Sequence, residues 1–176
     1  MRRMTIPFLL FAASILVVQP MTAQVDLTDA RTAEQKNARS TWMISYAWTG
    51  MISHAKSVGQ TPEEFGHWIG RYIAPTWGAP GSQTLQSFVR GMFLNYNLWD
   101  GLEFEILTDT PTEVRGRMNT PYAGFFGESG VRNDTTLEEF RTAQTIVYED
   151  TADHLGFDMI HEVDGDWIVF TVRSRF

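Results

Sequence analysis

Three histidines in this chain are predicted to point inward from three different elements. His54 lies at the edge of the apolar arc of an early helix, His154 within the arc of the last helix, and His161 on the apolar face of the closing hairpin. Neutral imidazole binds zinc, copper and iron well, and Asp150, one helical turn before His154, would be a fourth ligand or would support one. These four residues form a hypothetical divalent metal site, with Asp150 or Glu149 as the base of a metal-assisted hydrolysis.

The same histidines also fit a simpler interpretation. A single histidine on an apolar face is more often a hydrogen-bonded core residue, and none of the three lies in a short ligand motif such as His-x-x-x-His. His154, near the end of its helix, would also interact favourably with the helix dipole. By contrast, His67 falls opposite the apolar stripe of its helix and is expected to be exposed.

Aromatic residues favour a binding pocket over a catalytic site. Their number exceeds what a core of this size needs, as shown by Trp48, Trp68, Tyr72, Trp77, Tyr96, Trp99, Phe125 and Phe126. Apolar pockets that contain a few polar groups are the usual sites for small ligands. We therefore expect a ligand site to draw on His54, Tyr96, Phe125, Phe126, Gln144, His154 and His161.

The composition excludes several classes of function. The chain has no cysteine, which excludes disulfides, thiolate nucleophiles and thiolate metal ligands. Its 21 acidic and 14 basic residues give a net charge of −7, and so acidic a domain is repelled by phosphate backbones and anionic lipids. The stretch Gly127–Gly130 fits neither a nucleophile elbow nor a phosphate-binding loop. We expect the partner to be a small apolar molecule or a protein, and neither nucleic acid nor a membrane.

Residues 1–23 are predicted to be a secretory signal peptide. Arg2 and Arg3 precede an apolar run from Ile6 to Val18, and Ala23 is a small residue suited to cleavage. The run has about 13 residues, whereas a helix needs about 20 to span a bilayer, so a permanent anchor is less favoured. Cleavage would change the charge from −7 to −9, because it removes the two arginines and none of the acids. We expect residues 24–176 to form a single exported domain, periplasmic or extracellular.

Capping signals predict where the helices begin. A polar helical stretch after Thr28 continues to Gly59, and Thr61-Pro62-Glu63-Glu64 is a capping box with proline at the first helical position. Ser82 is the expected cap of a third helix. A second capping box, Thr136 with Glu139, starts a helix that continues to about Leu155.

Each predicted helix carries an apolar stripe with a spacing of three and four residues. The first stripe comprises Ile44, Trp48, Met51, Ala55 and Val58. The second comprises Phe65, Trp68, Ile69, Tyr72 and Ile73. The third comprises Leu85, Phe88, Val89, Met92, Tyr96 and Trp99. In the last helix, Gln144, Thr151 and His154 lie within an arc otherwise formed by Leu137, Phe140, Val147, Tyr148 and Leu155.

Alternating periodicity after Asp100-Gly101 predicts a first β-hairpin. A register that sets Glu105 opposite Arg115 also sets Glu103 opposite Arg117, so that the charges share one face. This favours an exposed ladder of ion pairs over a catalytic carboxylate pair, because neighbouring arginines keep glutamates ionised.

A second hairpin is predicted at the end of the chain, around a two-residue turn at Asp164-Gly165. Pairing Val163 with Asp166 sets His161 opposite Ile168. One face of this hairpin is then almost entirely apolar.

The stretch 121–130 is rich in glycine and aromatic residues. One interpretation is a loop whose Phe125 and Phe126 fill the core, and the other is a lid over a pocket.

The order of the predicted elements and the closing hairpin resemble the small ligand-binding domains related to bacteriochlorophyll 4-vinyl reductase. The aminothiazoline-carboxylate hydrolases end in a similar way. Gly165, Asp166 and Phe170 match the closing motif of these families, whereas Ile168 stands in place of their cysteine. The resemblance covers about the last 90 residues, and it implies an α+β domain with a pocket between helices and sheet, without the cysteine chemistry.

We therefore expect an α+β fold in which three to four helices pack on an antiparallel sheet made from two β-hairpins. The favoured function is non-enzymatic binding of a small apolar ligand or a protein partner. The alternative is a metal-dependent hydrolase that uses the inward-facing histidines.

Overall fold

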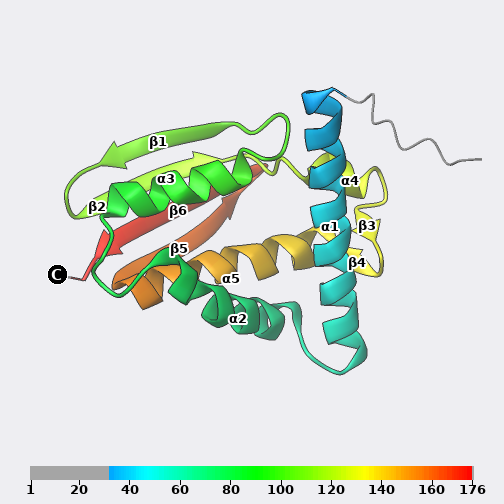
Figure 1. The fold of residues 1–176 in the computed structure, drawn as a ribbon, viewed down its shortest axis with the longest axis horizontal. Coiled ribbons are helices and arrows are strands. Elements are labelled where there is room, and N and C mark those ends of the chain that lie inside the picture. Colours follow the sequence, from blue (N-terminus) through cyan, green and yellow to red (C-terminus); the bar gives the residue numbers. More distant parts are fainter. Residues whose placement is uncertain (1–31, 176) are drawn as a thin grey trace, which may run out of the picture. The chain divides into compact units, whose positions relative to one another are not determined.

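The two predicted hairpins join into one antiparallel sheet. The computed structural model describes residues 32–175. In this region the strands β1 (Phe104–Asp109), β2 (Glu113–Met118), β5 (Phe157–Asp164) and β6 (Trp167–Ser174) follow the order β1-β2-β6-β5 (Figure 1). The expected α+β class is confirmed. The predicted signal peptide lies outside the described residues.

Helices cover one face of this sheet. The helical elements of the described region are α1 (Ala33–Ser57), α2 (Pro62–Ile73), the 3₁₀ turn η1 (Ala74–Trp77), α3 (Leu85–Tyr96), the short α4 (Ala123–Phe126) and α5 (Leu137–Leu155). As Figure 1 shows, α3 and α5 lie against the sheet, α2 packs beside α5, and α1 runs past α4 and the ribbon of β3 (Val131–Arg132) and β4 (Thr135–Thr136). None of the helices within residues 32–175 is both long and apolar enough to cross a membrane.

The core lies between the sheet and the helices α3 and α5. Phe88 and Met92 from α3, and Phe140 from α5, are fully buried together with Ile168 and Phe170 of β6. Burial of each such side chain stabilises the fold by about 1.5–3 kcal/mol. This core gives the elements around it fixed positions.

Two of the predicted capping boxes are confirmed, and one predicted cap is wrong. Thr61 with Glu64 and Thr136 with Glu139 exchange the expected hydrogen bonds. The third helix is capped by Thr84 rather than by Ser82, because the Thr84 hydroxyl accepts a hydrogen bond from the Ser87 amide at 3.1 Å. The helix therefore begins at Leu85.

Both hairpins pair two residues away from the predicted register. Glu105 lies opposite Arg117, and their side chains form an ion pair at 2.7 Å. His161 lies opposite Phe170, and the strands meet at Asp164 and Trp167. A shift of two residues preserves the alternation of a strand, so most of the predicted faces are correct although the partners are wrong. The exceptions are Val163, and Ile106 next to an irregularity in β1, which are exposed.

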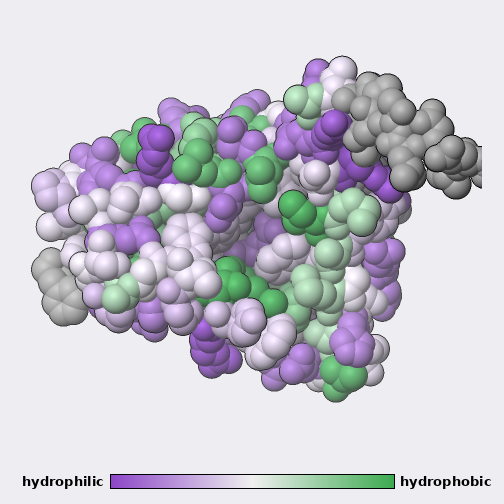
Figure 2. Space-filling model, in the orientation of Figure 1, coloured by the Kyte–Doolittle hydropathy of each residue, from purple (hydrophilic) through white to green (hydrophobic). Residues whose placement is uncertain are grey.

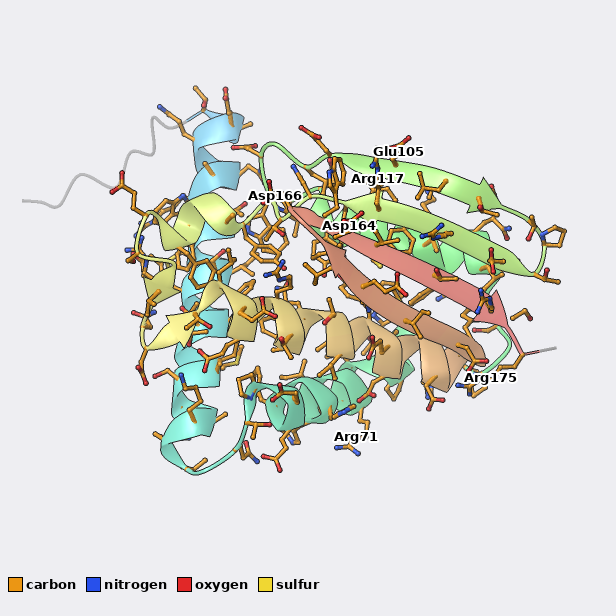
Figure 3. The ribbon with its side chains drawn as sticks, turned by 180° about the vertical axis from the view of Figure 1, so that it is seen from behind. Arg71, Glu105, Arg117, Asp164, Asp166 and Arg175 are labelled. Carbon is orange, nitrogen blue, oxygen red and sulfur yellow. The ribbon has the colours of Figure 1, made fainter. Side chains whose placement is uncertain are left out.

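The outward face of the sheet carries these charges. Figure 3 shows Glu105 and Arg117 close together on β1 and β2, and Asp164 and Asp166 at the turn between β5 and β6. The Arg117 guanidinium also lies 4.4 Å from the ring centre of Trp167. Because Glu105 and Arg117 are solvent-accessible and paired, they support the interpretation of a surface ion pair rather than a catalytic site.

The predicted buried face of α1 is right for Ala55 and wrong for three of its five members. The helix faces the rest of the domain with Thr41, Ser45, Thr49 and Ile52, whereas Ile44, Met51 and Val58 of the expected stripe are exposed. The three hydroxyl groups donate hydrogen bonds to carbonyls of the preceding turn, which satisfies them inside the protein. Large apolar side chains are thereby left on the flanks of α1.

The predicted apolar stripe of α2 is right for Phe65 and Ile69, which pack on the core, but a close approach to α5 leaves part of it exposed. Gly66 and Gly70 face α5, and a methyl group on Gly66 would lie 2.9 Å from the Ala143 carbonyl oxygen. Because the glycines occupy the interface, Trp68 and Tyr72 of the predicted stripe are 56% and 75% exposed. His67 is exposed as expected.

Candidate functional site

The predicted metal ligands do not come together. His54 is exposed between α1 and α2, so its expected inward orientation is wrong. His154 instead places Nε2 3.0 Å from the carbonyl oxygen of Gly78. Within residues 32–175, no group of three or more histidine, aspartate or glutamate side chains is arranged to hold a metal ion.

The remaining predicted ligands form two separate pairs. The His161 side chain is buried as expected, and its Nδ1 lies 3.0 Å from Oε1 of Glu149, which accepts its hydrogen bond. Asp150 lies on the other side of α5, where its carboxylate is 3.0 Å from Nδ1 of His67. Glu149 and Asp150 therefore serve different histidines, and the hypothetical hydrolytic site is not assembled by these residues.

A cavity of about 180 Å³ lies instead where α1, η1, α3 and α5 meet. Figure 2 shows a hollow between α1, α2 and α3 that is bordered by hydrophobic side chains. We call this cavity the aromatic pocket. Its lining comprises Ile44, Trp48, Ile73, Trp77, Asn95, Leu98, Trp99, Gln144, Val147 and Tyr148.

Four aromatic rings form much of the lining of this pocket. Trp77 and Tyr148 meet at an interplanar angle of 86°, with ring centres 6.1 Å apart. Trp48 packs edge-on against Phe140 of the core, which holds its ring in place. Edge-to-face pairs of this kind are favoured beyond the area that they bury, so the walls of the pocket are well anchored.

The turn after α3 is held by the hydroxyl face of α1. The Thr41 hydroxyl shares its one proton between the carbonyl oxygens of Asn37 and Leu98, at 3.0 and 2.9 Å. Trp99 Nε1 donates to Ser45 Oγ at 3.2 Å. Leu98 and Trp99 both line the pocket. The buried hydroxyl groups of α1 therefore hold Leu98 and Trp99 in one wall of the pocket. Ile44 and Trp48 of the same helix form another wall.

Gln144 supplies the polar group of the pocket. Its side chain is 5% exposed, and within residues 32–175 its Oε1 atom has no hydrogen-bond partner. A buried amide oxygen without a partner costs about 1–3 kcal/mol. The sequence-based expectation that Gln144 points inward is confirmed, and its carbonyl is suited to accept a hydrogen bond from a ligand or from water.

Three buried tyrosines cluster at the pocket: Tyr148 lines it, whereas Tyr96 and Tyr122 lie behind its wall. The rings of Tyr96 and Tyr148 are 5.3 Å apart, and Trp99 contacts both Tyr96 and Tyr122. Burial raises the pKa of Tyr148 to about 12, and its hydroxyl forms a side-chain hydrogen bond with Asn95. Burial also raises the pKa of Tyr96 and that of Tyr122. All three phenols therefore stay neutral at physiological pH.

Tyr96 thus supports the pocket from behind, because it is 1% exposed and does not belong to the lining. Phe126 is buried in the core, and Phe125 contacts Trp42 and Tyr46 of α1 edge-on. The core-filling interpretation of this segment is confirmed for both phenylalanines. Phe125 also borders a separate cavity of about 170 Å³. Trp99 lines both this cavity and the aromatic pocket and lies between them.

Two larger hollows differ from the aromatic pocket in the polar groups of their lining. One, of about 250 Å³, lies between α3 and the strands β1 and β2, and the other, of about 700 Å³, is an open groove between α1 and α2. Among the described residues, neither is lined by a buried polar side-chain atom that lacks a partner. The cavity of about 170 Å³ is lined by Tyr122, whose buried hydroxyl also lacks a partner among the described residues, but Thr41, Ser45 and Asp100 make its lining more polar. The aromatic pocket, with its mostly apolar lining and the Gln144 carbonyl, is therefore the candidate site for an apolar ligand.

Several residues of the pocket are absent from the expected ligand site, namely Trp48, Trp77, Asn95, Trp99 and Tyr148. The aromatic excess in the sequence included the three tryptophans as candidate pocket residues. The predicted apolar stripes, however, assigned Trp48, Trp99 and Tyr148 to the core. The clearest signal is Gln144, a polar residue between Phe140 and Val147 on an apolar face.

No protein-family model, curated protein or solved structure matches this chain.

Proposed function

We propose that this protein binds a small, largely apolar ligand in the aromatic pocket and does so without catalysis. The observation that carries the proposal is the buried Gln144 carbonyl oxygen, which lacks a hydrogen-bond partner within residues 32–175 and belongs to an otherwise mostly apolar lining. Pockets of this composition use a few polar groups to orient a ligand.

The dimensions of the pocket restrict the ligand to a small molecule or to one group of a larger one. An apolar cavity of about 150 Å³ accommodates benzene. The aromatic pocket, at about 180 Å³, is slightly larger. It is smaller than the roughly 300 Å³ at which sites for drug-sized ligands begin.

The chemistry of the pocket suits a ligand with an apolar body and a hydrogen-bond donor at one edge. The Gln144 carbonyl accepts hydrogen bonds, and the Tyr148 hydroxyl is engaged with Asn95. A ligand that donates to Gln144 would remove the cost of burying that oxygen. On the signal-peptide prediction, this binding would take place outside the cytoplasm.

A titration with two matched probes tests the proposal. Phenol and toluene have nearly the same shape, but only phenol carries a hydroxyl donor. In an NMR titration, the indole N–H signals of Trp48, Trp77 and Trp99 report the pocket, and that of Trp68 serves as an internal control from the surface of α2. We expect both probes to shift the pocket signals, and phenol to bind roughly fivefold to tenfold more tightly because of one hydrogen bond.

A different pattern would contradict the proposal. Absence of saturable shifts at the three pocket signals would show that the pocket takes no ligand of this size. Shifts confined to Trp68 would move the binding site to the groove between α1 and α2.

A protein partner is the second candidate, and the open groove between α1 and α2 favours it. Tyr46, Met51, Val58 and Trp68 line this groove and are exposed. Tyr72 stacks on Trp68 with an interplanar angle of 17° and extends the exposed aromatic surface. Replacing Trp68 and Tyr72 together by serine should abolish capture of a partner that binds here and leave phenol binding unchanged. Capture that survives this double substitution would exclude the groove.

A further inference from the structure

We infer that the ligand of the aromatic pocket carries a quaternary ammonium group, and this inference rests on the proposed function. Three tryptophans and one tyrosine, Trp48, Trp77, Trp99 and Tyr148, line a cavity of about 180 Å³. Tryptophan is the aromatic side chain that attracts cations most strongly, and cages of such rings recognise methylated ammonium groups.

The arrangement of the rings suits an occupant that is enclosed on several sides. The rings come from α1, η1, the turn after α3, and α5, which approach the pocket from different directions (Figure 1). Trp77 and Tyr148 stand nearly perpendicular to each other. Trp77 packs against α3 at Gly91, where a methyl group would lie 2.6 Å from the indole ring. The close packing holds this wall at a fixed distance from the others.

The electrostatics of the lining favour a cation. The lining residues in the described part of the chain are all uncharged, so no lysine, arginine or histidine opposes a positive ligand there. The Gln144 carbonyl oxygen presents its negative end, and the polarised methyl groups of a quaternary ammonium are weak donors toward such an oxygen. The chain as a whole carries a charge of −7, which attracts cations to the surface.

The cavity also limits how much of the ligand enters. A trimethylammonium group is similar in size to benzene, which fits a cavity of about 150 Å³. A group of this kind would therefore fill the pocket, and the remainder of the ligand would extend toward solvent. Both a free molecule such as choline and a phosphocholine headgroup present this chemistry.

Isothermal titration with choline and with 3,3-dimethylbutan-1-ol tests the inference, because the alcohol replaces the charged nitrogen by a carbon of the same shape. We expect choline to bind about tenfold more tightly. The preference should persist in about 1 M salt, where attraction to the acidic surface is screened.

Trp48 and Trp68 provide a matched pair of variants. Both rings contact Phe65, at 6.0 and 6.2 Å between ring centres, but Trp48 lines the pocket and Trp68 does not. We expect Trp48→Leu to bring the choline preference close to one, Trp48→Phe to retain part of it, and Trp68→Leu to leave it unchanged. The ratio of choline affinity to alcohol affinity can be compared between variants even if one of them loses some stability. Should Trp48→Leu fail to fold, the ratio measured for the wild-type protein tests the inference by itself.

The outcomes separate the inference from the proposal on which it rests. Equal affinity for choline and the alcohol overturns the quaternary ammonium and keeps the apolar pocket. If neither compound binds while phenol does, the quaternary ammonium is overturned and the apolar pocket is kept; if phenol also fails to bind, both are overturned. If choline is preferred, sedimentation with phosphatidylcholine vesicles identifies the source: co-sedimentation that free choline competes away assigns the group to a lipid headgroup, and its absence assigns it to a soluble molecule.

Discussion

Trp99 donates a hydrogen bond from Nε1 to Oγ of Ser45 across 3.2 Å, which joins a wall of the aromatic pocket to the buried face of α1. Ser45 is 1% exposed, and its own hydroxyl donates to the carbonyl of Thr41 one turn earlier. The hydroxyl thus serves both the helix and the indole. A small polar residue facing the core is explained by this double role.

Ser45→Ala is expected to destabilise the protein by about 1–2 kcal/mol, because it leaves the Trp99 indole N–H without its acceptor. Urea unfolding at neutral pH measures the change. Ser40→Ala is the matched control, since the Ser40 hydroxyl makes the same kind of bond to the carbonyl one turn earlier but is exposed. Equal effects of the two substitutions would show that the Trp99 contact contributes nothing.

Gln144→Met is expected to stabilise the ligand-free protein by about 1 kcal/mol while it weakens phenol binding by about tenfold. The substitution keeps the length of the side chain and removes an amide oxygen that has no partner among the described residues. A stabilising substitution that reduces binding is typical of a functional site. Thermal or urea unfolding and the phenol titration measure the two effects.

Thr151→Val is the control for this experiment. Thr151 is buried on the same helix, but its hydroxyl donates to the Val147 carbonyl at 2.7 Å. Its replacement should bring no stabilisation. If Gln144→Met is as destabilising as an ordinary core substitution, the Gln144 carbonyl is satisfied in solution and the argument from its burial fails.

Gly66→Ala is expected to cost about 1–3 kcal/mol, because the added methyl group would lie 2.9 Å from the Ala143 carbonyl oxygen of α5. Gly50→Ala is the opposite case, since Gly50 lies within α1 and a methyl group there would meet nothing within 4 Å. It should stabilise the protein by about 0.5–1 kcal/mol. Chemical denaturation of both variants checks the sign, and a neutral Gly66→Ala would contradict the close packing of α2 on α5.

Because the Tyr148 phenol is buried, we predict that the folded protein loses stability in alkali. Burial raises its pKa to about 12 in the folded protein, against about 10 in an unfolded chain. The folded state therefore keeps a proton that the unfolded state releases, and stability present below pH 10 falls as the pH rises to 12. This one group contributes a slope of about 1.4 kcal/mol per pH unit in that window.

The comparison with Tyr148→Phe isolates this effect. The variant lacks the phenol, so its free energy of unfolding should fall less steeply between pH 10 and 12, whereas the lost hydrogen bond with Asn95 gives an offset that does not vary with pH below 10. Parallel pH profiles for the two proteins would show that the Tyr148 hydroxyl is accessible to water.

Features set by local sequence were predicted well. The capping boxes at Thr61 and Thr136 depend on residues three positions apart, and the structure contains both. Most of the inward faces of the hairpins follow from alternation, so they are correct even though Glu105 and His161 pair two residues away from the expected partners. Ile106 and Val163, which are exposed, are not covered by this rule.

Features set by contacts between elements were not predictable in the same way. On α1, apolar periodicity pointed to Ile44 and Met51, but Thr41 and Ser45 are buried. Their contacts with Leu98 and Trp99 form only in the folded chain. On α2, the glycine pair that lets the backbone approach α5 turns Trp68 outward.

The candidate site shows the same division. The inward position of Gln144 could be inferred from its neighbours on α5, whereas its grouping with Trp48, Trp77 and Trp99 depends on four segments that meet only in the fold. Likewise, nothing in the spacing of His154 and His161 indicated that Gly78 and Glu149 would be their partners.

A crystal structure of the protein soaked in phenol tests the central claim most directly. We predict that phenol lies between Trp48, Trp77 and Trp99, with its hydroxyl about 2.7–2.8 Å from the Gln144 carbonyl oxygen. An aromatic pocket that holds only water at saturating phenol, or phenol bound only in the groove between α1 and α2, would contradict it.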